Sequence, residues 1–157
     1  MVPRIFRLLT AGLGVLLLWS VYSGWWSLAT LDNFYEIGPR GVRYCRGVVC
    51  TWGDAERLAT GDSWGLLGTT TLVSTSLAAC GLFFLCVLSG KRAKWVARAV
   101  AALCLFGLGL GVSVAAKAPL VEGMQHTFAL ASYFIATGAG IAASTVVFTR
   151  SSQESAR

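Results

Sequence analysis

The two residues of this chain best suited to chemical reaction are Cys45 and Cys50, which lie in the stretch GVRYCRGVVCTWGD. Thiols at this spacing can close a disulfide across a tight turn, because β-prone residues flank both and Arg46-Gly47 supplies turn chemistry between them. The pair can also alternate between dithiol and disulfide, as the catalytic cysteines of a membrane thiol oxidoreductase do. Four-helix enzymes of that kind use C-x-x-C with a second cysteine pair or a quinone. The spacing here is C-x-x-x-x-C, which favours the static disulfide.

The other residue types favour a protein that is not an enzyme and holds no cofactor or metal. The chain has one histidine, His126, whereas haem and metal sites need several. It contains no phosphate loop, nucleophile elbow or paired catalytic carboxylates. No acid or base lies in the middle of an apolar run, which disfavours a proton-coupled transporter. A small channel or transporter stays open as an alternative.

The elements that must carry the cysteines are membrane helices. Only 13% of the 157 residues are charged, against about 25% in an ordinary soluble domain. Continuous runs rich in Ala, Leu and Gly reach the roughly 20 residues that cross a bilayer, and they favour helices over barrel strands. We predict an all-α membrane protein with one domain, residues 1–157. Its four-transmembrane-helix bundle spans about 8–26, 64–88, 95–116 and 127–148.

Tryptophans mark the ends of these spans. Trp25, Trp26, Trp64 and Trp95 are expected in the headgroup layer, where amphipathic rings prefer to lie. The first span could instead be a signal peptide cleaved after Ala29, but its length and its paired tryptophans favour an uncleaved anchor. The last residues, TRSSQESAR, are predicted to form a disordered tail.

Basic residues beside the spans set the orientation. One group of loops opposes its Lys and Arg with a single acid, Glu154, whereas the other carries six acids. The first group, with both termini, is expected in the cytoplasm, which places the loop of about 27–63 outside. We expect a multi-pass protein of the plasma membrane or a bacterial inner membrane. The net charge of +6 does not indicate nucleic acid, because the basic residues flank apolar spans.

The outer loop therefore lies in an oxidising compartment, where a Cys45–Cys50 disulfide is the expected state. Chain-entropy arithmetic for so short a loop gives about 2 kcal/mol. This is enough to hold a β-hairpin or small sheet that would be marginal alone. The stapled structure is either a rigid surface for a partner or only a local stabilising device.

The layout resembles the claudin and peripheral-myelin-protein superfamily. Members carry a Trp early in the first loop, then Gly-Leu-Trp and two cysteines. Trp26 takes the early position, and Gly41 to Tyr44, directly before Cys45, is a counterpart of the Gly-Leu-Trp-x-x-Cys run. Gly38-Pro39-Arg40 is a second possible alignment. The literal Gly-Leu-Trp is missing ahead of the cysteines, and the cysteine pair is closer than in typical claudins.

The resemblance implies a left-handed four-helix bundle capped by a small antiparallel sheet, in which the two cysteines bridge adjacent strands. It also implies work in adhesion, lateral assembly or as an accessory subunit. We therefore expect a non-enzymatic protein of the lipid bilayer that binds another membrane protein or itself as a homo-oligomer.

Small residues in the third and fourth spans are suited to close helix packing. Gly107 and Gly111 form G-x-x-x-G, and Ala136 and Gly140 repeat the small-x-x-x-small pattern. Such seams serve packing within the chain or contact with a second chain, and the sequence leaves both open.

A basic cluster lies at the cytoplasmic start of the third span: Lys91, Arg92, Lys94 and Arg98. Each Lys or Arg near the membrane surface contributes about 1 kcal/mol to the binding of anionic lipid. The cluster is either a lipid-headgroup site or a plain stop-transfer signal.

The predicted orientation can be tested by thiol labelling in intact cells, with Cys80, Cys86 and Cys104 replaced by Ser. We expect Cys45 and Cys50 to resist alkylation until they are reduced, and then to react with a membrane-impermeant maleimide added outside. Labelling by a reagent confined to the cytosol would contradict the orientation.

Overall fold

The computed structural model describes residues 4–31, 33–53, 63–118 and 123–155. Helices and strands follow one another as α1 (Arg4–Tyr22), β1 (Trp26–Ala29), β2 (Asn33–Gly38), β3 (Gly41–Arg46), β4 (Val49–Gly53), α2 (Ser63–Val87), α3 (Gly90–Ala116), β5 (Gln125–His126) and α4 (Phe128–Ser155).

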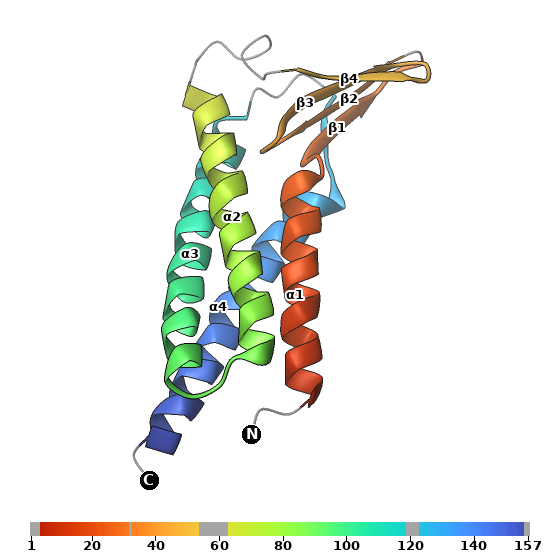
Figure 1. Ribbon diagram of the computed structural model, residues 1–157. Helices are drawn as coiled ribbons and strands as arrows, with labels where there is room; N and C mark the ends of the chain where they lie inside the picture. The colour runs from red at the N-terminus through yellow and green to blue at the C-terminus, as the bar shows by residue number, and fades with distance from the viewer. Residues whose placement is uncertain (1–3, 32, 54–62, 119–122, 156–157) are drawn as a thin grey trace.

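Among the described residues, four helices are long and apolar enough to cross a membrane. They lie side by side with both chain ends at one end of the bundle and the sheet at the other (Figure 1). Helix α2 packs against α1 and α3, and α4 packs against α3 and α1. The predicted bundle of four apolar helices with a small disulfide-closed sheet is confirmed at this level.

The helix ends differ from the predicted spans. Helix α1 ends at Tyr22 because Trp26 already belongs to a strand, and α3 begins five residues before Trp95. Helix α4 continues to Ser155, so the prediction of a disordered tail is wrong up to that residue. No Gly or Pro follows Phe148 to stop the helix, and it continues past its apolar segment.

Tyr133 of α4 lies against a groove on α3 formed by Gly107 and Gly111. Its hydroxyl donates a hydrogen bond to the Gly107 carbonyl at 2.6 Å and lies 3.4 Å from Thr75 Oγ1 of α2. A Cβ on Gly111 would overlap the Tyr133 ring, which shows why the groove needs glycine. One side chain thus joins three helices.

Ala136 and Gly140 lie on the same inward side of α4 and are also buried. A Cβ on Gly140 would lie 3.1 Å from Cys104 Sγ of α3. The four small residues predicted to pack helices, Gly107 and Gly111 included, therefore lie at contacts within this chain. They are not exposed on an outer face.

The sheet is antiparallel, with strand order β4-β3-β2-β1-β5, and it is called the outer sheet below after its predicted side of the membrane. Glycines allow its tight turns: Gly41 has φ +121° after the β2–β3 turn, and Gly47 has φ +58° in the β3–β4 turn. Strand β5 comes from the connection between α3 and α4, and it pairs Trp26 with His126 and Ser27 with Gln125. The segment after α1 and the segment after α3 therefore form one sheet.

Trp25 and Trp26 lie inside the junction between sheet and bundle, 0% and 1% exposed. The Trp25 indole donates to the Ser20 carbonyl, and its ring centroid lies 4.7 Å from that of Tyr133. Both rings are enclosed by the protein, so they do not face lipid headgroups as exposed interfacial tryptophans would. Trp95 is 70% exposed, as an interfacial residue would be, and the side chain of Trp64 lies outside the described residues.

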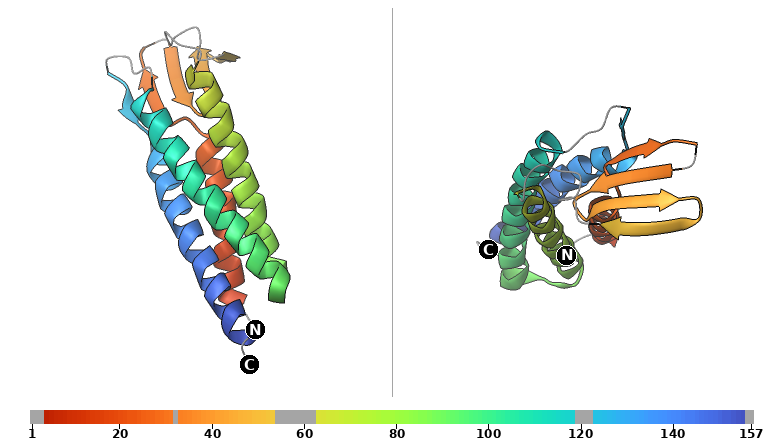
Figure 2. Two further views of the ribbon diagram at one scale, coloured as in Figure 1. Left: turned by 90° about the vertical axis from the view of Figure 1, so that its left-hand side faces the viewer. Right: turned by 90° about the horizontal axis from the view of Figure 1, so that it is seen from above.

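Seen from above, the sheet projects to one side of the helices, past α1 (Figure 2). The turns that join β1 to β2 and β3 to β4 lie at its far end, whereas the β2–β3 turn lies near the bundle. In the part of the chain that the structure describes, the far end therefore projects away from the helices.

The groove on α3 leads to a matched pair of substitutions. We expect Gly111→Ala to lower the free energy of unfolding by about 1–3 kcal/mol, because the new methyl group overpacks against Tyr133. Gly109→Ala, two residues away, meets no atom within 4 Å and should be neutral or slightly stabilising. Thermal unfolding of both variants in one detergent measures the difference, and equal melting temperatures would contradict the packing argument.

Candidate functional site

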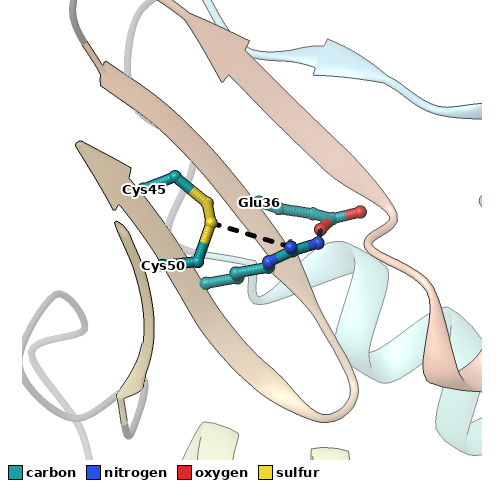
Figure 3. Close-up of a disulfide and its surroundings, with 4 residues drawn as sticks. Glu36, Cys45 and Cys50 are labelled. Carbon is teal, nitrogen blue, oxygen red and sulfur yellow. Dashed lines mark hydrogen bonds and ion pairs between the residues drawn. A yellow bond between two sulfur atoms is a disulfide. The ribbon is translucent and has the colours of Figure 1, made fainter. Parts of the chain in front are cut away.

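The predicted disulfide joins β3 to β4 at the far half of the sheet. Cys45 and Cys50 are directly opposite each other in the strand register, and their sulfurs are bonded (Figure 3). Only Gly47 and Val48 separate the paired residues Arg46 and Val49. The disulfide therefore locks a two-residue turn, and the expectation of a stapled hairpin is confirmed.

A charged pair lies on the same sheet face as the disulfide. Arg43 Nη1 is 3.6 Å from Glu36 Oε2, and Arg43 Nη2 is 3.7 Å from Cys50 Sγ (Figure 3). The other carboxylate oxygen of Glu36 accepts a hydrogen bond from the Gly24 amide at 3.0 Å. The chain Gly24–Glu36–Arg43–Cys50 ties the linker after α1 to the disulfide hairpin.

A guanidinium beside a sulfur stabilises a thiolate, so this geometry would assist reduction of the disulfide at Cys50. Dithiol catalysis also needs a second redox group that exchanges electrons with the pair. The three free cysteines, Cys80, Cys86 and Cys104, lie in helices α2 and α3, not in the sheet. The arrangement favours a structural bond.

The residues of the claudin-like motif do not meet in one place. Trp26 is buried at the junction, with its ring 6.0 Å from that of His126 and its Nε1 unpartnered among the described residues. Gly41 forms the turn near the bundle. Tyr44 lies farther out, packs against Tyr35 at 4.8 Å and donates to an Asn33 oxygen. Each supports the sheet at a different point.

The far end of the sheet carries apolar side chains that sequence reasoning missed. Leu31 and Val48 are fully exposed in the β1–β2 and β3–β4 turns, and Val49 beside them is mostly exposed. An open hollow of about 670 Å³ lies there, lined in part by Leu31, Phe34 and Cys45. The signal was present, since apolar residues stand where turns usually carry polar ones.

The basic cluster at the other end of the molecule divides into two pairs. Lys91 and Arg92 are exposed in the first turn of α3. Lys94 and Arg98 lie over one ring of α4, Phe148, at 5.0 and 4.7 Å from its centroid. The sequence could not show this, because Phe148 is fifty residues from Arg98.

Among the described residues, no three His, Cys, Asp or Glu side chains converge as metal ligands would. Comparison with protein-family models, curated proteins and solved structures finds no match to this chain. The claudin resemblance thus depends on layout and motif, and the function is a matter for proposal.

Removing the disulfide should loosen the hairpin and leave the bundle intact. We expect the Cys45→Ser/Cys50→Ser variant to lose about 2 kcal/mol of local stability, the loop-entropy value for so short a ring. Hydrogen exchange at β4 should then rise by up to about thirtyfold, while α2 to α4 keep their protection. Unchanged exchange at β4, or loss of protection in all helices, would contradict a purely local role.

Proposed function

We propose that this chain is a non-enzymatic interaction, adhesion or accessory subunit that binds another membrane protein, or a second copy of itself, through the far end of its outer sheet. The observation that carries the proposal is the exposure of Leu31 and Val48 at two neighbouring turns. Exposed apolar residues that gather on one part of a surface mark sites of contact with other proteins or with membranes.

The far end has the make-up of an interface. Apolar side chains at its two turns stand beside a hollow with Phe34 in its lining, and Arg46 adds a charged side chain there. Apolar centres with polar rims are typical of protein contacts. The lining also contains Thr30 and Asn33, so a partner's apolar or polar side chain can enter the hollow. The turns of this chain carry apolar side chains, so self-association is included in the proposal.

Rigidity supports the same use. The disulfide closes one turn, and the Glu36–Arg43 pair holds β2 to β3 along the same face. A surface ordered before contact loses less conformational entropy on binding. The resemblance to claudins and peripheral myelin proteins points the same way, since it implies adhesion or accessory work through the first outer loop.

The orientation in this proposal follows the basic residues. Arg4, Arg7, Lys91 and Arg92 belong to the end of the bundle that carries both chain termini, opposite the sheet. The sheet would then face outward from the plasma membrane or a bacterial inner membrane, where it can meet the outer part of a neighbouring protein.

Redox work is the second candidate, favoured by the 3.7 Å contact between Arg43 and Cys50 Sγ. Alkylation followed by non-reducing gels decides between the two. A bond that cycles readily in membranes favours a thiol oxidoreductase, and a bond that stays closed favours the structural role.

The interaction is tested by photo-crosslinking in intact cells, with the crosslinking amino acid placed at Val48 and, as a control, at exposed Gln125. We expect a discrete adduct from Val48 only, reduced at least tenfold by Leu31→Ser. Co-expression of two differently tagged copies shows whether the adduct is a homodimer. No adduct from Val48, or equal adducts from both positions, would contradict the proposal.

A further inference from the structure

The inner end of the α3–α4 seam brings two cations onto one aromatic side chain. Lys94 Nζ lies 5.0 Å and Arg98 Cζ lies 4.7 Å from the centre of the Phe148 ring. Arg98 also lies 5.4 Å from the ring of Trp95. Cation–π contacts hold both groups, which belong to α3, at defined positions over a ring of the neighbouring helix α4. Two converging positive groups on a fixed support suit a single bound anion.

The local charge balance calls for such an anion. The sequence gives this end one acid, Glu154, whose side chain lies outside the described residues, and the charged side chains described here are all basic: Arg4, Arg7, Lys91, Arg92, Lys94, Arg98 and Arg150. The first turn of α3 contains Lys91 and Arg92 but no acid, and Ser89 makes no side-chain cap there. Cations near a helix N-terminus oppose the helix dipole. A bound anion would reduce both the repulsion among the clustered cations and the repulsion between these cations and the dipole of α3.

The surface beside this cluster fits a lipid better than a soluble anion. Residues seven apart share a helix face, so Lys91, Arg98, Leu105 and Val112 form one stripe along α3. Leu105 and Val112 are 57% and 54% exposed. The stripe is cationic at the chain-terminal end and apolar toward mid-membrane, which is the order of a phosphate headgroup and its acyl chain.

We propose that the inner α3–α4 seam is a binding site for an anionic glycerophospholipid in the leaflet at this end of the bundle. Its phosphate lies between Lys94 and Arg98 above Phe148, and an acyl chain runs along Leu105 and Val112. Trp95 lies at the same level, where its amphipathic ring anchors the helix at the interface. The site is independent of what the outer sheet binds.

The test is native mass spectrometry of the purified full-length protein, titrated with phosphatidylglycerol or phosphatidylcholine. We expect tighter binding of phosphatidylglycerol, weakened about thirtyfold in Lys94→Gln/Arg98→Gln, since each residue contributes about fivefold. The matched control, Arg4→Gln/Arg7→Gln, removes the same charge at the same end on α1, and should change affinity less than threefold. Phe148→Leu keeps the apolar packing without the aromatic face and should weaken binding severalfold.

Further measurements keep the result decisive. If the double variant does not fold, the single variant Arg98→Gln replaces it, because Arg98 is exposed. This single variant should bind phosphatidylglycerol about fivefold more weakly than the unaltered protein. Inorganic phosphate at millimolar concentration should not displace the lipid. The proposal is overturned by equal binding of both lipids, by equal losses in the two double variants, or by displacement with phosphate, which would indicate a soluble-anion site.

Discussion

The contact between Trp25 and Tyr133 joins the two parts of this molecule, and most of the remaining structure depends on it. On the bundle side, Tyr133 lies in the Gly107–Gly111 groove and gives its hydroxyl hydrogen to a helix carbonyl, as a buried hydroxyl in lipid must. On the sheet side, the amide of Trp25 donates to Ile37, and its carbonyl accepts from Thr127. A single residue is thereby shared by α1, β2 and the start of α4, so the sheet is held against the helix ends instead of hanging from flexible loops.

Hydropathy was sufficient to predict the four helices because lipid allows few other backbone structures at that depth, and an even number of such helices places both termini at a shared end. Local sequence was insufficient for the sheet beyond the cysteine hairpin. Strand β1 looked like the end of a span, because Trp25 and Trp26 are apolar and follow an apolar run. Their role depends on Ile37 and His126, which periodicity within a span cannot reveal.

The candidate site shows the same division. The Cys45–Cys50 bond follows from spacing and turn chemistry inside one six-residue segment, so it was predictable. The pairing of Glu36 with Arg43 depends on strand register, and the seating of Lys94 and Arg98 on Phe148 depends on how α3 meets α4. Leu31 and Val48 do not stand out in the sequence, because most of the chain is apolar. Their exposure follows from the three-dimensional positions of the two turns, which the sequence does not give.

The short strand β5 has a consequence for how the protein is made. It supplies the outer neighbour of β1, yet it lies about a hundred residues later in the chain, beyond α2 and α3. Three helices, α1 to α3, must therefore be synthesised and inserted before β5 can cover the free edge of β1. Until then the nascent first loop carries an open strand edge that could pair with the wrong chain. The hairpin closed by Cys45 and Cys50 is complete much earlier, so its disulfide can stabilise one side of the sheet while the other side waits for its last strand.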